Sequence, residues 1–214
     1  MDTSTPTVSV ALVDGDQVVA RRDDLANNAH GEVLALLIDA VLREVSARTA
    51  DLSALGVGLG PGPFTGLRVG IVTAAAMSDA LGVPAYGQCS LDVVRRVDAQ
   101  PCAVVTDARR RQVYWAWYDE RGRRVEGPDI APPADVAARL RGHVQNVSGP
   151  GAAQYADVFA DFHVMEAQWP DAAALAKTAT DQLTTGAVAG PLTPMYLRRP
   201  DAREPGPPKR VTPA

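Results

Sequence analysis

The glycines and prolines between Gly58 and Gly70 (GLGPGPFTGLRVG) are the residues whose spacing first suggests chemistry. A glycine-rich turn between a strand and a helix is typical of a phosphate-binding loop, because N–H groups at the helix start can point at the anion. A Walker loop needs Lys and Ser/Thr after its last glycine, but Leu-Arg follows Gly66 here. Pro61 and Pro63 lack the N–H groups that a dinucleotide loop uses. We therefore interpret the stretch as a rigid turn that orients the following helix, with phosphate binding as the minority alternative.

The remaining candidates for catalysis do not form a recognisable set. His30, His143 and His163 are far apart, and no HxxxH or HExxH pair is present for a metal. The sequence has no GxSxG elbow, and Cys89 has no evident partner base. Cys89 and Cys102 form no CxxC pair, so we interpret them as buried thiols in a reducing compartment. The sequence predicts no catalytic residue, no cofactor site and no metal site.

A charged turn and an aromatic strand lie next to each other in the middle of the chain. Asp107 and Arg109–Arg111 precede the segment QVYWAWY, and basic residues beside aromatic ones occur in RNA-binding surfaces. The formal net charge is −4, whereas a protein that binds nucleic acid alone needs a basic surface. We therefore favour a solvated turn and a packed strand, and an RNA-binding module remains a rival hypothesis. A subunit of a larger RNA-acting complex is not excluded.

Two predicted helices carry more apolar surface than one core face needs. The helix Thr65–Leu81 has only Arg68 and Asp79 as charges, and small residues recur on it every four positions. The helix Gly31–Arg48 has apolar residues over an arc of roughly 240°. Such a surplus favours an interface with another protein. The predicted interface consists of Val33, Leu36, Ala40, Gly66, Gly70, Ala74 and Met77.

The order of elements predicts an α/β protein with two mixed lobes. We expect one lobe over residues 1–100, a reduced second lobe over 101–195, and a C-terminal segment with a disordered tail over 196–214. The first 16 residues do not look like a signal peptide, and no apolar stretch reaches membrane-spanning length, which predicts a cytoplasmic location without membrane contact. The predicted elements are a hairpin (Val8–Val13, Gln17–Ala20), strands at Ala54–Leu59, Ala103–Thr106, Gln112–Tyr118 and Val144–Val147, an extended piece from Val125, a helix capped by Ser90, and helices at Pro133–Arg141 and Asp171–Leu183.

At GPGPFTGLRVG the chain resembles the bacterial TsaB family, formerly YeaZ. Four further blocks agree in order and extend the resemblance to Arg199: DTSTPTVSVALVDGD, HGEVL from His30, DARRRQVYWAWY, and PMYLR from Pro194. The resemblance implies an actin-like ATPase (ribonuclease H-like) fold of two lobes, the second reduced. It also implies the dimerisation subunit of the complex that makes N6-threonylcarbamoyladenosine (t6A) at position 37 of tRNA.

That resemblance also implies partners. They are a TsaD-type catalytic subunit and a TsaE-type ATPase, with tRNA bound only through the complex. ATP is used by the complex, and no cofactor is expected on this chain alone. The sequence does not decide between a monomer and a homodimer in isolation, nor whether a nucleotide binds at the subunit interface.

The resemblance also implies a comparison with the catalytic paralogue, TsaD, which carries a metal-binding histidine pair and complete phosphate loops. Two loops of this sequence differ from that pattern. The first loop, Asp2–Thr5, lacks the usual glycine, and bulky arginines follow Asp107 where a second glycine-rich loop would stand. Side chains there would keep a phosphate away from the backbone. This favours a non-catalytic paralogue over an independent actin-like nucleotide-binding or metallopeptidase-like enzyme.

The start of the chain carries one more expectation. The family has a short apolar strand before its Asp-Thr-Ser/Thr motif, and here Met1 directly precedes Asp2. We expect that strand to be shortened in this sequence, either because translation begins upstream or because the sequence is trimmed. An extension by about five apolar residues should then raise the melting temperature, since each unsatisfied buried backbone group costs roughly 1–3 kcal/mol.

Overall fold

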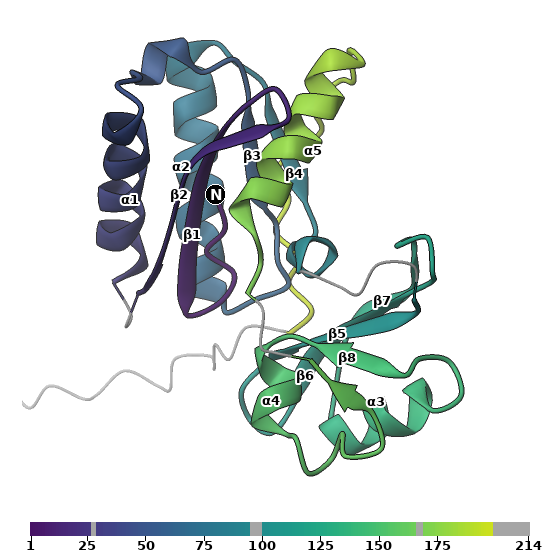
Figure 1. Cartoon of the computed structure of the whole chain (residues 1–214). Helices are drawn as coiled ribbons and strands as arrows, with labels where there is room; N and C mark the ends of the chain where they lie inside the picture. Colours follow the sequence, from purple (N-terminus) through teal and green to yellow (C-terminus); the bar gives the residue numbers. More distant parts are fainter. Residues whose placement is uncertain (27–28, 95–99, 166–168, 199–214) are drawn as a thin grey trace, which may run out of the picture.

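Two groups of strands lie at opposite ends of the molecule in the computed structural model, which describes residues 1–26, 29–94, 100–165 and 169–198 (Figure 1). The first group contains the antiparallel hairpin β1 (Thr7–Asp14) and β2 (Gln17–Leu25) and the parallel pair β3 (Leu55–Gly58) and β4 (Ala85–Gln88). Helices α1 (His30–Glu44) and α2 (Phe64–Leu81) cover one face, and α5 (Ala172–Thr184) packs on β1 and β3 from the other. The predicted α/β class is confirmed.

The first two residues join the two strand pairs into one layer. Asp2 and Ser9 exchange backbone hydrogen bonds of 2.8 and 3.0 Å. On the other side, the Met1 amino group donates to the Gly56 carbonyl at 2.8 Å, and the Gly58 N–H donates to the Met1 carbonyl at 3.1 Å. The N-terminus therefore lies between β1 and β3, in the middle of this layer.

The second group is a five-stranded sheet in the order β7-β6-β5-β8-β9. Strands β5, β6 and β7 are antiparallel neighbours, while β8 and β9 run parallel to β5. One face carries a core in which Trp115 and Phe159 are fully buried against α3. The bounds are β5 Cys102–Asp107, β6 Val113–Tyr118, β7 Arg124–Ala131, α3 Pro133–Leu140, β8 Asn146–Ser148, α4 Pro150–Gln154 and β9 His163–Val164.

Several sequence-based boundaries change in the structure. α1 ends at Glu44 rather than Arg48, because Ser46 has φ of +57° and Thr49–Asp51 forms a separate 3-10 turn. Ser90 does not cap a long helix: Ser90–Val93 is a short 3-10 turn, and residues 95–99 lie outside the described part. The sequence reading also missed β4, α4 and β9.

The predicted second lobe also includes a helix that packs elsewhere. α5 lies against β1 and β3, and the Met195 N–H donates to the Leu59 carbonyl at 2.8 Å. The second group therefore ends before Ala172, and the boundary predicted at residue 195 is corrected. The predicted tail beyond Pro200 falls outside the described residues. None of the helices described is both long enough and apolar enough to cross a membrane.

Candidate functional site

The segment Asp2–Thr5 is buried against the glycine-rich turn and holds it in place. The Asp2 side chain is 1% exposed, and one of its oxygens accepts from the Ser4 N–H (2.8 Å) and hydroxyl (2.6 Å). Its other oxygen accepts from the Ser90 hydroxyl at 2.6 Å, and Ser90 Oγ in turn accepts the Gly60 N–H at 3.1 Å. The carboxylate therefore receives three hydrogen bonds from its own chain.

The glycines of the turn are packed against this segment. A methyl group on Gly58 would overlap the Asp2 carboxylate, and one on Gly62 would overlap the Ser4 carbonyl group. The close approach that glycine permits is thus used for packing within the chain. This geometry favours the rigid turn over a phosphate cradle.

One side of α2 faces the same N-terminal segment. The Thr3 hydroxyl donates to the Gly66 carbonyl at 2.8 Å and accepts the Gly70 N–H at 3.0 Å. A Cβ atom on Gly70 would lie 2.5 Å from Thr3 Oγ1, and Ala74 is fully buried. The assignment of Gly66, Gly70 and Ala74 to a partner surface is therefore corrected, because their own chain covers them.

The other four residues of the predicted interface divide between the inside and the outside of the fold: Val33 and Met77 pack against the core, and Met77 also lines a cavity between β1 and β3. Leu36 on α1 is 69% exposed, and Val72 on α2, which the sequence reading did not include, is 63% exposed. Ala40 on α1 is half-buried. We call Leu36, Ala40 and Val72 the α1–α2 face: apolar side chains on two adjacent helices that the folded chain leaves exposed or half-exposed, whereas the assignment of Val33 and Met77 to a partner surface is corrected.

A second exposed surface forms where α2 meets the C-terminal segment. The Phe64 and Tyr196 rings stack with centroids 4.5 Å apart. The Arg68 guanidinium lies 3.7 Å from the Phe64 ring centroid, and its Nε donates to the Tyr196 hydroxyl at 2.9 Å. Residues more than 120 positions apart in the sequence thus form one stacked unit.

The charged turn between β5 and β6 continues this surface. Arg198 donates to the Arg109 carbonyl at 3.4 Å and to the Gln112 side chain, while Tyr114 donates to the Gly62 carbonyl at 3.4 Å. Burial raises the pKa of the Tyr114 hydroxyl, and the nearby charges of Arg198 and Arg109 oppose that shift. Three sequence blocks (GPGPFTGLRVG, DARRRQVYWAWY and PMYLR) therefore meet at one place. No periodicity along the sequence signals this convergence.

The histidines and Cys89 are placed apart in the structure. His30 Nε2 lies 3.1 Å from the Thr5 carbonyl oxygen, His143 stacks on Trp117, and His163 begins β9. Across residues 1–26, 29–94, 100–165 and 169–198, no group of three or more His, Cys, Asp or Glu side chains could hold a metal ion. Burial raises the pKa of the Cys89 thiol to about 11, so it is protonated at neutral pH.

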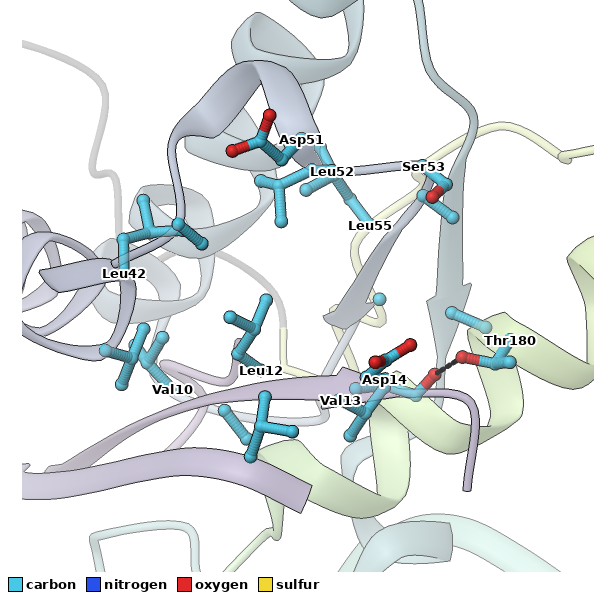
Figure 2. A pocket seen from close by; sticks show the side chains of 18 of the residues that line it. Val10, Leu12, Val13, Asp14, Leu42, Asp51, Leu52, Ser53, Leu55 and Thr180 are labelled. Carbon is cyan, nitrogen blue, oxygen red and sulfur yellow. Dashed lines mark hydrogen bonds between the residues drawn. The ribbon is translucent and has the colours of Figure 1, made fainter. Parts of the chain in front are cut away.

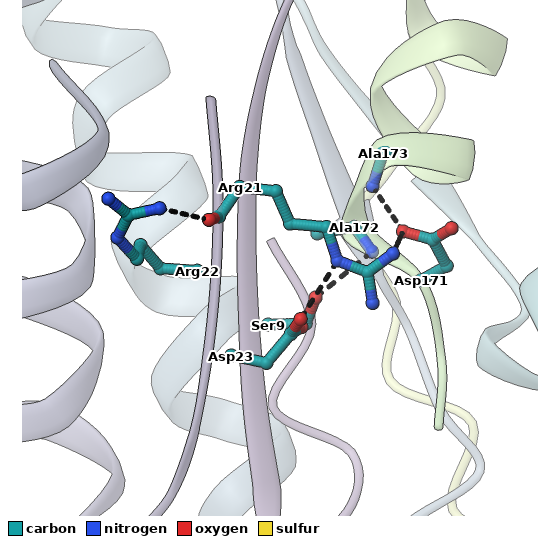
Figure 3. A network of polar contacts seen from close by, with 7 residues as sticks. All are labelled: Ser9, Arg21, Arg22, Asp23, Asp171, Ala172 and Ala173. Atoms are coloured by element: carbon teal, nitrogen blue, oxygen red, sulfur yellow. Dashed lines mark hydrogen bonds and ion pairs between the residues drawn. The ribbon is translucent and has the colours of Figure 1, made fainter. Parts of the chain in front are cut away.

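A polar network fastens the start of α5 to the hairpin (Figure 3). The Arg21 guanidinium pairs with Asp23 at 2.8 Å and with Asp171 at 3.1 Å. The same Asp171 side chain caps α5 by accepting the Ala173 N–H at 2.8 Å. The adjacent Ala172 N–H donates to Ser9 Oγ at 3.2 Å. These partners fix the position of a helix, so we assign the network to folding.

A cavity of about 580 Å³ lies between β1 and β3, and α1 and α5, which cover opposite faces of the strand layer, both contribute to its lining (Figure 2). Its lining is mainly apolar and includes Val10, Leu12 and Leu55. The Met1 amino group is buried at its edge, and this burial lowers the pKa of the amino group to about 6. Its polar lining residues are Asp14, Asp51, Ser53 and Thr180, and no group of His, Cys, Asp or Glu among the described residues could hold a metal ion there, so we interpret the cavity as a gap in the sheet layer.

The sequence of this chain is similar to a known protein family and to individual relatives. The family model of TsaD, tRNA N6-adenosine threonylcarbamoyltransferase, matches residues 22–187. An uncharacterized protein of Mycobacterium tuberculosis, Rv3421c, is 41% identical over 205 residues, which are 95% of this chain and 92% of that protein. The tRNA threonylcarbamoyladenosine biosynthesis protein TsaB of Escherichia coli is 33% identical over 129 residues, covering 57% of this chain and 55% of TsaB.

Two solved structures from Pseudomonas aeruginosa are also similar to this chain. A Pseudomonas aeruginosa protein described as similar to peptidase YEAZ superimposes with a TM-score of 0.77 at 25% identity, over 92% of this chain and 97% of that one. YeaZ from Pseudomonas aeruginosa gives a TM-score of 0.74 at 24% identity with the same coverage. The chain therefore has the fold of these structures.

Proposed function

The chain belongs to the TsaB (YeaZ) family, and we propose that it is a non-catalytic subunit of the system that makes t6A at position 37 of tRNA. In this role it binds a TsaD-type threonylcarbamoyltransferase and supports its activity. The reaction takes place in the cytoplasm, and a TsaE-type ATPase joins the complex and uses ATP. The tRNA is bound through the complex rather than by this chain alone.

The observation that carries the proposal is the α1–α2 face. Leu36 and Val72 are large apolar side chains, each more than 60% exposed, on neighbouring helices. Burying such side chains contributes about 1.5–3 kcal/mol each, so a partner that covers both gains substantial affinity. A TsaD-type subunit is the heterologous partner that fits this face, and a second copy of the chain is its rival when that subunit is absent.

The packing of the N-terminal segment supports a non-catalytic role. The Asp2 carboxylate, which opens the first loop, is engaged by three donors of its own chain. The backbone of Gly62 lies against Ser4. A nucleotide phosphate would have to displace these contacts before it could approach the turn. An independent actin-like or metallopeptidase-like enzyme is therefore the weaker candidate.

The double variant Leu36→Asp with Val72→Asp tests the partner surface. We expect its dissociation constant for the host's TsaD-type subunit to rise at least about thirtyfold, because the loss of even one central apolar anchor costs about 2 kcal/mol or more. Binding is measured by calorimetry, and the mass of the complex by light scattering. The matched control is Val125→Asp on β7, which is also exposed and lies in the other strand group.

Unchanged affinity in a folded double variant would place the partner elsewhere and overturn the proposal. The isolated chain should also show neither ATP hydrolysis above background nor threonylcarbamoyl transfer to tRNA. Turnover by the isolated chain that is lost in an Asp2→Asn variant with an unchanged melting temperature would favour the independent enzyme instead.

A further inference from the structure

Five arginines gather where α2, the β5–β6 turn and the C-terminal segment meet. They are Arg68, Arg109–Arg111 and Arg198, and we call this group, together with the stacked rings of Phe64 and Tyr196, the junction ridge. All but Arg198, which is half-buried, are exposed. The nearest carboxylate on the same turn is Asp107, which accepts the Arg109 N–H at 3.0 Å. Four of the five, Arg68, Arg109, Arg111 and Arg198, form no ion pair with a carboxylate among the described residues, and they give the ridge a local positive charge on a chain whose net charge is −4.

The contacts of two ridge residues, Arg68 and Arg198, differ from those of several arginines elsewhere. Arg43, Arg48 and Arg123 form ion pairs of 2.8–3.1 Å with carboxylates on their own helix or turn. Arg68 instead contacts a hydroxyl and two aromatic rings, and Arg198 contacts a carbonyl and an amide oxygen. Neutral contacts orient a guanidinium without neutralising its charge, so it can still bind an anion.

The ridge is also held in shape before any ligand arrives. Arg109, Arg110 and Arg111 have φ of +60°, +52° and +58°, a left-handed turn closed by the Gln112 N–H donating to the Arg109 carbonyl at 3.0 Å. Left-handed backbone is unfavourable for residues other than glycine, and such strain persists only where surrounding contacts impose it. Arg198 supplies one of those contacts from the C-terminal segment.

We propose that the junction ridge binds the phosphate backbone of the tRNA substrate, an inference that rests on the proposed function. Guanidinium groups bind phosphate oxygens through charge-assisted hydrogen bonds. The partly exposed rings of Phe64 (36%) and Tyr196 (38%) offer a face on which an unpaired base can stack. The ridge spans both strand groups, which suits an extended polyanion better than the single phosphate group of a mononucleotide.

The test uses the complex with the TsaD-type subunit and compares two double variants. Arg109→Glu with Arg111→Glu reverses two charges on the ridge. Arg121→Glu with Lys177→Glu makes the same change in net charge on exposed residues at the other end of β6 and on α5. We expect the ridge variant to bind labelled tRNA at least tenfold more weakly near 0.1 M salt, with a salt slope smaller by about 1.4–1.8, since each of the two lost phosphate contacts contributes roughly 0.7–0.9. The control variant should bind like the unmodified complex.

The outcomes separate this inference from the proposed function. Light scattering first shows whether each variant forms the complex; if the unmodified chain forms none, both proposals fail. If the complexes form and the two double variants bind tRNA equally, only the ridge proposal fails. Binding of ATP is measured in parallel. An ATP affinity that falls while tRNA binding is retained would identify the ridge as a nucleotide site and overturn the RNA assignment.

Discussion

The N-terminal residues lie between β1 and β3, and the packing on one side of Met1 differs from the packing on the other. On the side of the glycine-rich turn, Asp2–Thr5 fills the space so closely that a methyl group on Gly58 or Gly62 would overlap it. On the other side of Met1, a cavity of about 580 Å³ separates β1 from β3 (Figure 2). The same layer is thus tightly packed at one end and open at the other.

This difference shows where the fold tolerates change. Protein interiors are normally close-packed, so an added atom at the tight end must displace its neighbours. Successive residues of a strand point their backbone hydrogen-bonding groups to alternate sides. Ser9 points its groups away from β2 toward Asp2, so Ala11, two residues further on, points its own groups to the same side and into the gap. Added chain there has both space and hydrogen-bonding partners. Substitutions at the tight end should destabilise the fold, whereas additions at the open end should stabilise it.

The largest expected effect is that of Gly70→Glu at the tight end. The new side chain would meet Thr3 at 2.5 Å and bury an unpaired charge, which costs several kcal/mol. We expect the free energy of unfolding to fall by more than about 4 kcal/mol, as measured by urea denaturation. Ala76→Glu is the matched control on the exposed side of α2, and it should change stability by less than about 0.5 kcal/mol. Equal stability of the two variants would show that the inward side of α2 is not tightly packed.

A smaller gain is expected from extending the chain at the open end by about five apolar residues before Met1. The added apolar side chains and the new backbone hydrogen bonds stabilise the folded chain, and the entropy lost in ordering the added backbone opposes part of this gain. We expect a net gain of about 2–3 kcal/mol, seen as a melting temperature higher by roughly 4–12 °C. A polar extension of the same length is the control and should give no gain.

The same extension should abolish a pH dependence. In the 214-residue chain, burial lowers the pKa of the Met1 amino group to about 6, below its usual value near 8. Between these values the unfolded chain binds the proton and the folded chain does not, so stability rises as the pH increases from about 6 to 8. A chain whose melting temperature is flat over this range, or falls, would contradict the burial of the amino group.

The sequence predicted the elements whose signals are local. The β1–β2 hairpin follows from alternation around Asp14–Gln17, and α2 ends at Leu81 because Gly82 adopts φ of +67°. The sequence also predicted the surplus of apolar surface on α1 and α2. Only the tertiary contacts show which side of each helix the rest of the chain covers. Gly70 looks as free as Ala76 on a helical wheel, and Thr3, some 67 positions away, decides the difference.

The contacts between segments far apart in the chain could not be predicted from the sequence. Tyr196 lies 128 positions from Arg68, and hydrogen bonding between them depends on the chain returning through α5 to the first strand group. The same return moves the end of the second group to a position before Ala172. Such contacts depend on tertiary topology, so no periodicity or spacing along the chain encodes them.

The smallest effect that tests the tight end comes from Thr3→Val, which keeps the shape of the side chain and removes its hydroxyl. That hydroxyl contacts the Gly66 carbonyl and the Gly70 N–H, which are four residues apart on the helix. Its loss removes a hydrogen-bond partner from two buried backbone groups. We expect a loss of about 1–2 kcal/mol in the free energy of unfolding, within the range for a broken buried hydrogen bond. Thr3→Ser retains the hydroxyl and should lose less. If Thr3→Val were as stable as the unmodified chain, the backbone groups of Gly66 and Gly70 would not need the hydroxyl as a partner, and the hydroxyl would not help to position the helix.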